Sequence, residues 1–540
     1  MTNLHMNILV AESLPAAALE LLTPQPGWHV ITSTPEEFRR HLADADALII
    51  RSSVQVDKAL LAAAPCLKVV GKAGTGAENI DIEAATAAGV LVMNTPGGNA
   101  VSVAEHTLGL MLAMARSIPQ ANASTKHGDW GRVRYVGTEL RGKTLGIVGL
   151  GSIGQEVVRR AKAFEMKILA NDPYVNSQSA ADLGVTLKPL GELFAQSDYI
   201  TLHVALTLET YALLNAAAFA KMKKGVRIVN CARGELIDGE ALRKAIESGK
   251  VAGAALDVFQ TEPVDSSEPL LKLDNVIATP HIGGATEEAQ ETVGVRIAEQ
   301  IVQFLRKGVA LNALNAPAMT SEQYRTVGPY AALAERLGTF AAYVANGNPR
   351  MVRLIYHGNI ASGNSADQNT HLIRNAGLAG VLSRSLHRKA NVVNALQIAA
   401  ERGLGYAERH DKRVGHADSI KLELETDEGV TQVEGALVLD RPRLLSVDGI
   451  RCEAPLTGHL IYLRNADVPG VIGYVGSVTG RNRINIANFS LGRQHAPSEE
   501  GGMLEAIAIV KTDEPVSDAV LQQLLENKSI TVARSVEFRD

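Results

Sequence analysis

Residues 143–172, KTLGIVGLGSIGQEVVRRAKAFEMKILAND, decide how this chain folds. The stretch begins with the apolar run TLGIV, continues through Gly149, Gly151 and Gly154 in the spacing G-x-G-x-x-G, and then reads as an amphipathic helix. A glycine-rich turn between a strand and a helix leaves the first backbone N–H groups of the helix free at its positive end, where phosphate binds. The context therefore predicts a βαβ unit with a pyrophosphate-binding turn.

An acidic residue completes this pattern. Asp172 stands eighteen residues after Gly154, directly after the apolar run KILA. Its carboxylate would accept hydrogen bonds from the ribose hydroxyls of an adenosine and would repel a 2′-phosphate, which favours NAD over NADP. We predict NAD as the cofactor, held by the three glycines, by Ser152 and Ile153 at the helix start, and by Asp172. Asp257, later in the same lobe, is also expected to contact it.

Short apolar runs alternate with helical stretches on both sides of this motif. One series starts at residue 6 and a second at residue 143. Continuously apolar strands separated by helices are typical of parallel sheets covered on both faces. The chain is therefore predicted to be an α/β protein with two doubly wound parallel-sheet lobes. Long amphipathic stretches flank the second series and are expected to cross between the lobes, with hinges near residues 98 and 286.

The character of the chain changes after LNALNAPAM, residues 311–319, which looks like a linker. The next stretch mixes helices with short strands, and the last has the order βαββαβ of a ferredoxin-like sandwich. The predicted domains are a discontinuous substrate-binding lobe (1–98 and 287–315), a Rossmann lobe (99–286), an α+β intervening domain (317–455) and a ferredoxin-like domain (456–540).

Composition narrows the class of protein. The chain has 540 residues, of which 21% are charged, and a net charge of -5, so it offers no broad basic surface for nucleic acid or anionic lipid. It has no apolar run of the about 18 residues that a membrane span needs, and it begins without the features of a signal peptide, which predicts a cytoplasmic protein. Its three distant cysteines lack metal-ligand spacing, so we expect neither a disulfide framework nor a metal site.

A second glycine-rich turn lies in VVGKAGTGAENID, residues 69–81. Asn79 stands where a dinucleotide-binding turn needs its third glycine. What remains at Gly74, Thr75 and Gly76 is a turn of successive exposed N–H groups, which suits an anion. We expect this turn to bind a substrate carboxylate.

Two cations lie beside that turn. Arg51 ends the apolar run ALII, and Lys72 lies inside the glycine-rich stretch. Both stand at predicted carboxyl ends of strands, where open α/β sheets bind ligands. Two cations beside an anion-binding turn suggest a substrate with one carboxylate and one phosphate. The alternative is that both side chains are solvated surface groups.

Arg233, Glu262 and His281 end apolar runs in the second lobe. Hydride transfer from a 2-hydroxy acid requires a base for the hydroxyl proton, a cation for the carboxylate and a group that orients the base. A histidine with a carboxylate on its far nitrogen is held in one tautomer and is stabilised when protonated. His106 and His203 are expected to be packing or supporting residues, because most histidines are structural.

Longer motifs resemble a known family. NCARGELIDGEALRKAIESGKVAGAALDVFQTEP (230–263) and TPHIGGAT (279–286) are similar to the D-isomer-specific 2-hydroxyacid dehydrogenases. VMNTPGGNAVSVAEHTLGLML (92–112) and the second glycine-rich turn resemble the branch of that family that oxidises 3-phospho-D-glycerate. The resemblance covers residues 5–315.

This resemblance implies a role for each candidate residue. His281 would be the acid/base, Glu262 its partner, and Arg233 the ligand of the substrate carboxylate and C2 oxygen. The remaining substrate-site residues would be Asn99 and the backbone of Gly74, Thr75 and Gly76, with Arg51 and Lys72 on the phosphate. Many members have arginine where this chain has Lys72, so the charge is kept but bidentate geometry is lost.

The expected reaction is the NAD-dependent oxidation of 3-phospho-D-glycerate to 3-phosphohydroxypyruvate, the first committed step of L-serine synthesis. A glyoxylate or hydroxypyruvate reductase, or another D-2-hydroxyacid dehydrogenase, is the alternative within the fold and would lack a preference for phosphate. An NAD-sensing binding protein is the alternative from another class. The docking groove and disordered tails expected of such a protein are not visible in the sequence.

Two further segments resemble parts of the long form of this family. LRNADVPGVIGYVGSVTGRNRINIANFSLGR (463–493) is similar to an ACT domain, which implies that Asn465, Asp467 and Asn485 bind L-serine as an effector. Val468 stands where arginine is common, so the alternative is a domain that only holds subunits together. The stretch before it resembles, more loosely, the intervening domain, and no ligand is assigned to it.

DWGRVRY, residues 129–135, resembles a family element that crosses a dimer interface. The resemblance implies a homo-oligomer, a dimer or a tetramer, in which Arg132 or Arg134 would lend positive charge to a neighbouring site. The alternative is that Trp130 is an ordinary core tryptophan.

Overall fold

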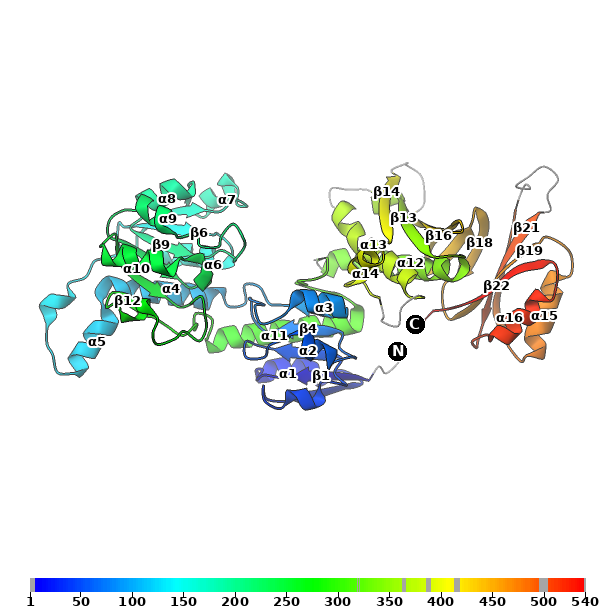
Figure 1. Cartoon of the computed structure of the whole chain (residues 1–540), viewed down its shortest axis with the longest axis horizontal. Coiled ribbons are helices and arrows are strands. Elements are labelled where there is room, and N and C mark those ends of the chain that lie inside the picture. The colour runs from blue at the N-terminus through cyan, green and yellow to red at the C-terminus, as the bar shows by residue number, and fades with distance from the viewer. Residues whose placement is uncertain are drawn as a thin grey trace.

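The computed structural model describes residues 5–317, 319, 321–361, 366–384, 390–411, 418–494 and 504–538. Figure 1 shows four units along the molecule, each built around one sheet. The sheets have five, seven, six and four strands in chain order. Two parallel sheets, an α+β unit and a ferredoxin-like unit confirm the predicted fold class.

A parallel five-stranded sheet organises the first lobe, in the order β2-β1-β3-β4-β5. The strands are β1 (Met6–Val10), β2 (Trp28–Thr32), β3 (Ala47–Ile50), β4 (Val69–Lys72) and β5 (Leu91–Met93). The helices are α1 (Ala16–Leu22), η1 (Phe38–His41), α2 (Lys58–Ala62) and α3 (Ile82–Ala88). Because the strand order changes direction between β1 and β3, the ligand crevice of a sheet with this order lies at the carboxyl ends of those strands.

The Rossmann lobe has a parallel seven-stranded sheet in the order β12-β11-β10-β9-β6-β7-β8. The strands are β6 (Thr144–Val148), β7 (Lys167–Asn171), β8 (Thr186–Leu187), β9 (Tyr199–Leu202), β10 (Val226–Asn230), β11 (Val251–Leu256) and β12 (Val276–Ala278). The helices are α6 (Ser152–Ala163), α7 (Ser177–Asp182), α8 (Leu190–Gln196), α9 (Ala216–Lys221), η3 (Gly234–Leu236), α10 (Gly239–Glu247) and η4 (Pro269–Lys272). The order reverses between β6 and β9, so the crevice of this lobe opens where the first glycine turn follows β6.

Two long helices run between the lobes (Figure 1). α4 (Ala100–Arg116) buries Leu108 and Met111 in the core of the Rossmann lobe, and α11 (Glu287–Lys307) buries Ile297 and Ile301 against the first sheet. The hydroxyl of Thr286 caps α11 by accepting the N–H of Ala289 at 3.1 Å. The first lobe therefore receives its last helix from chain that follows the Rossmann lobe.

An arm projects from the Rossmann lobe at the end of the molecule (Figure 1) and contains α5 (Ile118–Lys126) and η2 (Arg132–Tyr135). Trp130 is 75% exposed, and Val133 and Val136 are exposed to 89% and 84%. Trp130 is therefore not a core tryptophan of this chain.

The third unit has a mixed sheet in the order β14-β13-β15-β16-β17-β18. The strands are β13 (Pro349–His357), β14 (Gly405–Asp411), β15 (Ser419–Thr426), β16 (Val430–Val438), β17 (Arg441–Val447) and β18 (Ile450–Pro455). The helices are α12 (Ser321–Val344), η5 (Gly358–Ala361), α13 (Ala366–Leu382) and α14 (Ala395–Glu401). Leu337 and Phe340 of α12 share its core with Leu422 of β15.

The segment that the sequence suggests as a linker is bonded to the first lobe. The N–H of Leu314 donates to the carbonyl of Val92 at 2.8 Å, and the side chain of Asn315 accepts the N–H of Val92 at 2.9 Å. The third unit adds a contact of its own, since Asn391 donates to the carbonyl of Gly89 at 2.8 Å. The start of this segment thus extends the edge of the first sheet.

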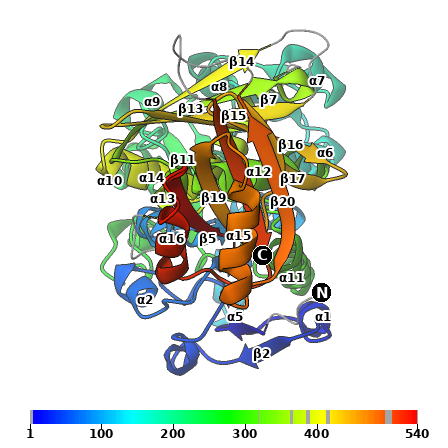
Figure 2. The same ribbon diagram turned by 90° about the vertical axis from the view of Figure 1, so that its right-hand side faces the viewer.

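The C-terminal unit has an antiparallel sheet in the order β20-β21-β19-β22. The strands are β19 (His459–Ala466), β20 (Ile486–Arg493), β21 (Glu505–Thr512) and β22 (Ile530–Glu537), and the helices are α15 (Val471–Arg481) and α16 (Asp518–Leu525). Figure 2 looks onto this end of the molecule and shows both helices in front of the sheet. The predicted βαββαβ order is confirmed. Within the described ranges, none of the helices has the length and apolar content to cross a membrane.

Candidate active site

His281 and Glu262 form a hydrogen-bonded pair on two loops at the carboxyl edge of the Rossmann sheet. Nδ1 of His281 lies 2.7 Å from Oε2 of Glu262, and both side chains are partly exposed, at 51% and 36%. The other carboxylate oxygen of Glu262 accepts the N–H of Phe259 at 3.0 Å. His281 has a φ of 53°, in the left-handed region that few residues other than glycine adopt, and its N–H donates to the carbonyl of Asp257 at 2.9 Å. Because the pair uses Nδ1, and no bond of Nε2 occurs among the described residues, Nε2 of His281 can face a substrate.

A buried carboxylate fixes the loop that carries His281. Asp257 is 1% exposed and accepts the hydroxyl of Thr279 at 2.5 Å and the N–H groups of Ile282 and Gly283 at 2.9 and 2.8 Å. Burial raises the pKa of Asp257, but the hydrogen bonds that it accepts outweigh burial and hold its pKa below the ordinary value. The structure thus places Asp257 beneath the loop, and its contact with NAD stays a prediction.

His106 of α4 lies beside the same carboxylate. Its Nε2 is 3.3 Å from Oδ1 of Asp257 and 3.2 Å from Oγ1 of Thr279. His203, the other histidine set aside in the sequence, is half-buried with Nδ1 enclosed, and burial lowers its pKa to about 3. Neither histidine is placed like His281, which lies on an exposed loop with a carboxylate partner.

Arg233 joins the two lobes. It follows β10 in the Rossmann lobe, and its Nε donates to Glu78 of the first lobe at 2.5 Å, while Nη2 pairs with the same carboxylate. Burial raises the pKa of Glu78, but the charge of Arg233, the hydrogen bonds that Glu78 accepts and the charge of Lys72 together hold its pKa below the ordinary value. Glu78 was not predicted as a site residue, although its place two residues after Gly76 was a signal. The pair sets Arg233 against the predicted anion-binding turn.

The anion-binding turn lies between the two lobes. A side chain at Gly76 would come within 2.6 Å of Nη2 of Arg233 and closer still to the carboxylate of Glu78, so both side chains would have to move. The hydroxyl of Thr75 is 3.0 Å from Oδ1 of Asn99, and a side chain at Gly284 would meet Nδ2 of Asn99 at 2.7 Å. Asn99 therefore touches both the turn of the first lobe and the loop of His281. The structure brings these predicted substrate residues together.

Arg51 and Lys72 have different surroundings. Arg51 lines a cavity of about 300 Å³ at the carboxyl ends of β1, β3 and β4, together with Ser13 and with two carboxylate side chains of α11, Glu287 and Glu291. Lys72 is only 4% exposed, and burial lowers its pKa to about 8. Of the two predicted phosphate ligands, Arg51 is the one that faces open space.

The predicted pyrophosphate turn has space for its ligand. A side chain at Gly149, where φ is 95°, would overlap the carbonyl of His203, and one at Gly154 would overlap the carbonyl of Gly149. At Gly151 a side chain would meet nothing within 4 Å. The outer glycines therefore allow close backbone packing, and the middle one leaves open space before Ser152 at the N-terminus of α6, where a phosphate fits.

Asp172 lies against that turn at the end of β7. Its carboxylate accepts the N–H of Leu150 at 2.8 Å and that of Tyr174 at 2.9 Å. Acceptor capacity remains for ribose hydroxyls, because a carboxylate can accept about four hydrogen bonds. An open phosphate position at Gly151 and a carboxylate beside it fit NAD.

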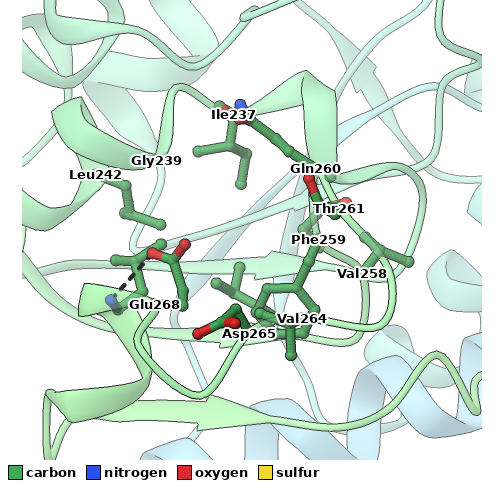
Figure 3. Close-up of a pocket in the computed structure, with 14 residues that line it drawn as sticks. Ile237, Gly239, Leu242, Val258, Phe259, Gln260, Thr261, Val264, Asp265 and Glu268 are labelled. Atoms are coloured by element: carbon green, nitrogen blue, oxygen red, sulfur yellow. Dashed lines mark hydrogen bonds between the residues drawn. The ribbon is translucent and has the colours of Figure 1, made fainter.

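A separate pocket of about 280 Å³ lies in the Rossmann lobe beneath the loop between β11 and η4 (Figure 3). Ile237, Leu242 and Phe259 form part of its wall. Asp265 at its edge accepts the N–H of Ser267 at 2.7 Å. Glu262 belongs to the same loop but does not line the pocket, so this cavity is distinct from the catalytic pair.

The predicted effector residues do not all meet within one chain. Asn465, at the end of β19, is 4% exposed, and its Oδ1 is buried without a hydrogen-bond partner among the described residues. Asp467 follows it, with Oδ1 at 3.5 Å from Nε of Arg493. Asn485 donates instead to Asp513 at 2.6 Å, at the opposite end of the sheet. A site made of all three predicted residues would need two chains.

Comparison with known proteins identifies the class. The model of the D-isomer specific 2-hydroxyacid dehydrogenase NAD binding domain matches residues 108–283, which include the glycine turn, Arg233, Glu262 and His281. A crystal structure of a glyoxylate reductase from Paecilomyes thermophila superposes with a TM-score of 0.52 and 32% identity, covering 58% of this chain and 99% of that one. The chain belongs to the D-isomer-specific 2-hydroxyacid dehydrogenase family and is an NAD-dependent oxidoreductase.

Relatives that match over almost the whole chain indicate which branch of the family it resembles. The model of the D-3-phosphoglycerate dehydrogenase intervening domain matches residues 326–448. D-3-phosphoglycerate dehydrogenase of Methanocaldococcus jannaschii is 42% identical over 527 residues, covering 97% of this chain and 98% of the relative. That of Archaeoglobus fulgidus is 40% identical over 537 residues, covering 99% and 100%. The similarity to these enzymes thus includes the C-terminal part of the chain, which the glyoxylate reductase does not match.

Proposed function

We propose that this protein oxidises 3-phospho-D-glycerate to 3-phosphohydroxypyruvate with NAD, the first committed step of L-serine synthesis. The observation that carries the proposal is the cavity lined by Arg51 at the crevice of the first sheet, on the lobe that also holds the anion-binding turn. A substrate with a carboxylate at one end and a phosphate at the other uses both positions. The full-length similarity to enzymes named for this substrate supports the same assignment.

In the proposed mechanism, His281 takes the proton of the C2 hydroxyl through Nε2 while Nδ1 stays bonded to Glu262. The carboxylate at 2.7 Å stabilises the positive charge that develops on the imidazole. Arg233 binds the substrate carboxylate and polarises the C2 oxygen, while the 74–76 turn and Asn99 fix the carboxylate. The glycine turn at 149–154 and Asp172 would hold NAD, which would supply the acceptor for the C2 hydride.

The proposal extends to the domains, the oligomer, the effector and the location of the protein. The substrate lobe is 1–98 with 287–315, the Rossmann lobe 99–286, the intervening domain 317–455 and the ACT domain 456–540. The exposed arm with Trp130 supports a homo-oligomer in which Arg132 or Arg134 reaches a neighbouring site. L-serine is the proposed effector, bound between two C-terminal domains, and the cytoplasm is the proposed location.

An assay of NADH formation tests the central assignment. The purified protein, given NAD and equal concentrations of 3-phospho-D-glycerate, D-glycerate or D-lactate, should form NADH fastest from the phosphorylated acid. Rapid oxidation of D-glycerate or D-lactate without activity on 3-phospho-D-glycerate would contradict the proposal and favour the reductase alternative. NADH binding without any turnover would favour the NAD-sensing alternative. Sizing the protein with and without serine tests the oligomer and its effector.

A further inference from the structure

The turn after β3, residues 51–54, is held on one side by a buried carboxylate. Glu12, which is 7% exposed, follows β1. One of its oxygens accepts the N–H of Arg51 at 2.6 Å and that of Val54 at 3.3 Å, and the other accepts the N–H of Ser53 at 3.1 Å. These bonds fix the backbone from which the Arg51 side chain leaves the sheet.

Two side chains from the glycine-rich stretch hold the other side of the same turn. Nζ of Lys72 donates to the carbonyl of Arg51, to Oγ of Ser52 at 3.2 Å and to Oδ1 of Asn79 at 3.0 Å. Nδ2 of Asn79 donates to the carbonyl of Arg51 at 2.9 Å and to that of Val54 at 2.6 Å. An ammonium has three donors, so Lys72 has none left for a phosphate in this arrangement.

We infer that Lys72 is a positioning residue, which with Glu12 and Asn79 fixes the turn so that Arg51 alone of the two cations binds the substrate phosphate. We call these three side chains the turn clamp. The inference rests on the proposed function, because it requires a phosphorylated substrate. It departs from the role that family resemblance implies for position 72, where the arginine of many members is replaced by lysine.

The electrostatics of the turn clamp agree with this geometry. Burial lowers the pKa of Lys72 to about 8, while the carboxylates of Glu12 and Glu78 oppose that effect. Arg51 and Arg233 lower the pKa further. The ammonium is thus surrounded by protein groups, whereas Arg51 lines an open cavity.

A double-mutant cycle separates a positioning residue from a second phosphate ligand, since residues that act through one another are not additive. The variants are Arg51→Ala, Lys72→Met and the pair of them. We expect Lys72→Met to raise the KM for 3-phospho-D-glycerate by about tenfold, as for a lost hydrogen bond to a charged group, with kcat within about twofold. In the Arg51→Ala background, Lys72→Met should change the KM by less than about twofold.

Two further variants keep the test decisive. Lys68→Met is the matched control, because Lys68 precedes the same strand but pairs with Asp46 at 2.9 Å on the surface, and it should leave the KM unchanged. Asn79→Ala removes both amide bonds to the turn without touching a charge. Its effect on the KM for 3-phospho-D-glycerate should likewise be smaller in the Arg51→Ala background than in the wild type. This variant therefore tests the inference even if Lys72→Met does not fold.

Each outcome has one meaning. Full additivity of Lys72→Met with Arg51→Ala, or an unchanged KM in Lys72→Met alone, would overturn the inference and leave the proposed function standing. A wild-type enzyme with no preference for 3-phospho-D-glycerate over D-glycerate would overturn the proposed function and this inference with it. Folding of each variant is checked by NADH binding, which uses the other lobe.

Discussion

The two glycine-rich turns differ in what the missing side chains make room for. In the Rossmann lobe, a side chain at Gly151 would meet nothing within 4 Å. In the first lobe, a side chain at Gly76 would collide with Glu78 and with Arg233. The turn of the Rossmann lobe leaves space for a ligand, whereas the turn at Gly76 in the first lobe is already occupied by the ion pair between Glu78 and Arg233. A glycine pattern therefore reports close approach but not the identity of the approaching group.

This difference divides the work between the lobes. The Rossmann lobe supplies the cofactor turn and the pair His281–Glu262. The first lobe supplies the 74–76 turn and Arg51, and the turn clamp holds the backbone of Arg51 in place. Changes at the cofactor turn and at the His281–Glu262 pair should therefore alter NAD binding and turnover, and changes at the 74–76 turn and at Arg51 should alter the KM of the substrate.

The largest effect is expected at His281. His281→Asn removes the base, so kcat should fall by about 10²- to 10⁴-fold, the usual contribution of general acid/base catalysis. The affinity for NADH, measured by fluorescence titration, should be unchanged. His127→Asn is the matched control, because His127 is an exposed histidine of the same lobe that bonds only the carbonyl of Ala123 among the interactions of its side chain described here. A near-normal kcat in His281→Asn would show that His281 is not the base, and that the His281–Glu262 pair does not determine turnover.

The cofactor turn should be the next most sensitive position. Gly151→Val places a side chain in the open space before α6, so the Kd for NADH should rise at least about a hundredfold, equivalent to about 2.7 kcal/mol. The thermal unfolding of the protein without NADH should be unchanged, because the new Cβ would meet no atom within 4 Å beyond the adjacent residues of the chain. Gly191→Val, at another open glycine of this lobe, is the control and should alter neither quantity. Unchanged NADH binding in Gly151→Val would show that the space is not the phosphate site.

Gly76→Ala should affect stability and substrate binding but not NADH binding. The new methyl group displaces the partly exposed Glu78–Arg233 pair, so the free energy of unfolding should fall by less than about 1 kcal/mol, the size of a surface ion pair. The KM for the substrate should rise, while the Kd for NADH stays the same. Gly109→Ala in α4, where nothing lies within 4 Å, controls for the added methyl group. Denaturant unfolding and steady-state kinetics measure both effects, and a loss of NADH binding equal to the loss of substrate binding would contradict the comparison.

The smallest effect is a dependence of KM on pH. The pKa of Lys72 is lowered from 10.5 to about 8, mainly by burial. As pH rises through 8, Lys72 loses its proton and one of its three donors, and the substrate phosphate does not change because its second pKa is about 6. The KM for 3-phospho-D-glycerate should therefore rise between pH 7 and 9 in the wild type and stay flat in Lys72→Met.

The same lowered pKa has a consequence for stability. Because the folded state disfavours charged Lys72, this group lowers the free energy of unfolding below pH 8, and that loss disappears as pH rises towards 10.5. The charged groups that face Lys72 are Glu12, Glu78, Arg51 and Arg233. The predicted rise of the KM with pH has its own contradicting result. A wild-type KM that stays constant from pH 7 to 9 would show that the charge of Lys72 does not affect substrate binding.

Much of the fold was predictable because its signals are local. Apolar runs that alternate with helices define both parallel sheets, and the order of elements after residue 456 defines the ferredoxin-like unit. The cofactor turn was equally local, since strand, glycines, helix and Asp172 lie within 30 residues. The pairing of His281 with Glu262 followed from chemistry, because a base needs a carboxylate to orient it.

The parts that sequence could not show depend on contacts between distant segments. Lys72 looks like a phosphate ligand until its bonds to the turn after β3, a different strand end, are seen. Glu78 meets Arg233 only after the two lobes are set side by side. The role of Asp257 beneath the loop of His281 likewise depends on a loop conformation that no spacing encodes.

A crystal structure with NADH and 3-phospho-D-glycerate bound would test the central claim most directly. We expect the carboxylate against Arg233 and the 74–76 turn, C2 within reach of Nε2 of His281, and the phosphate on Arg51 with Lys72 still bonded to the turn after β3. A phosphate bound away from Arg51, or a C2 atom turned from His281, would contradict it.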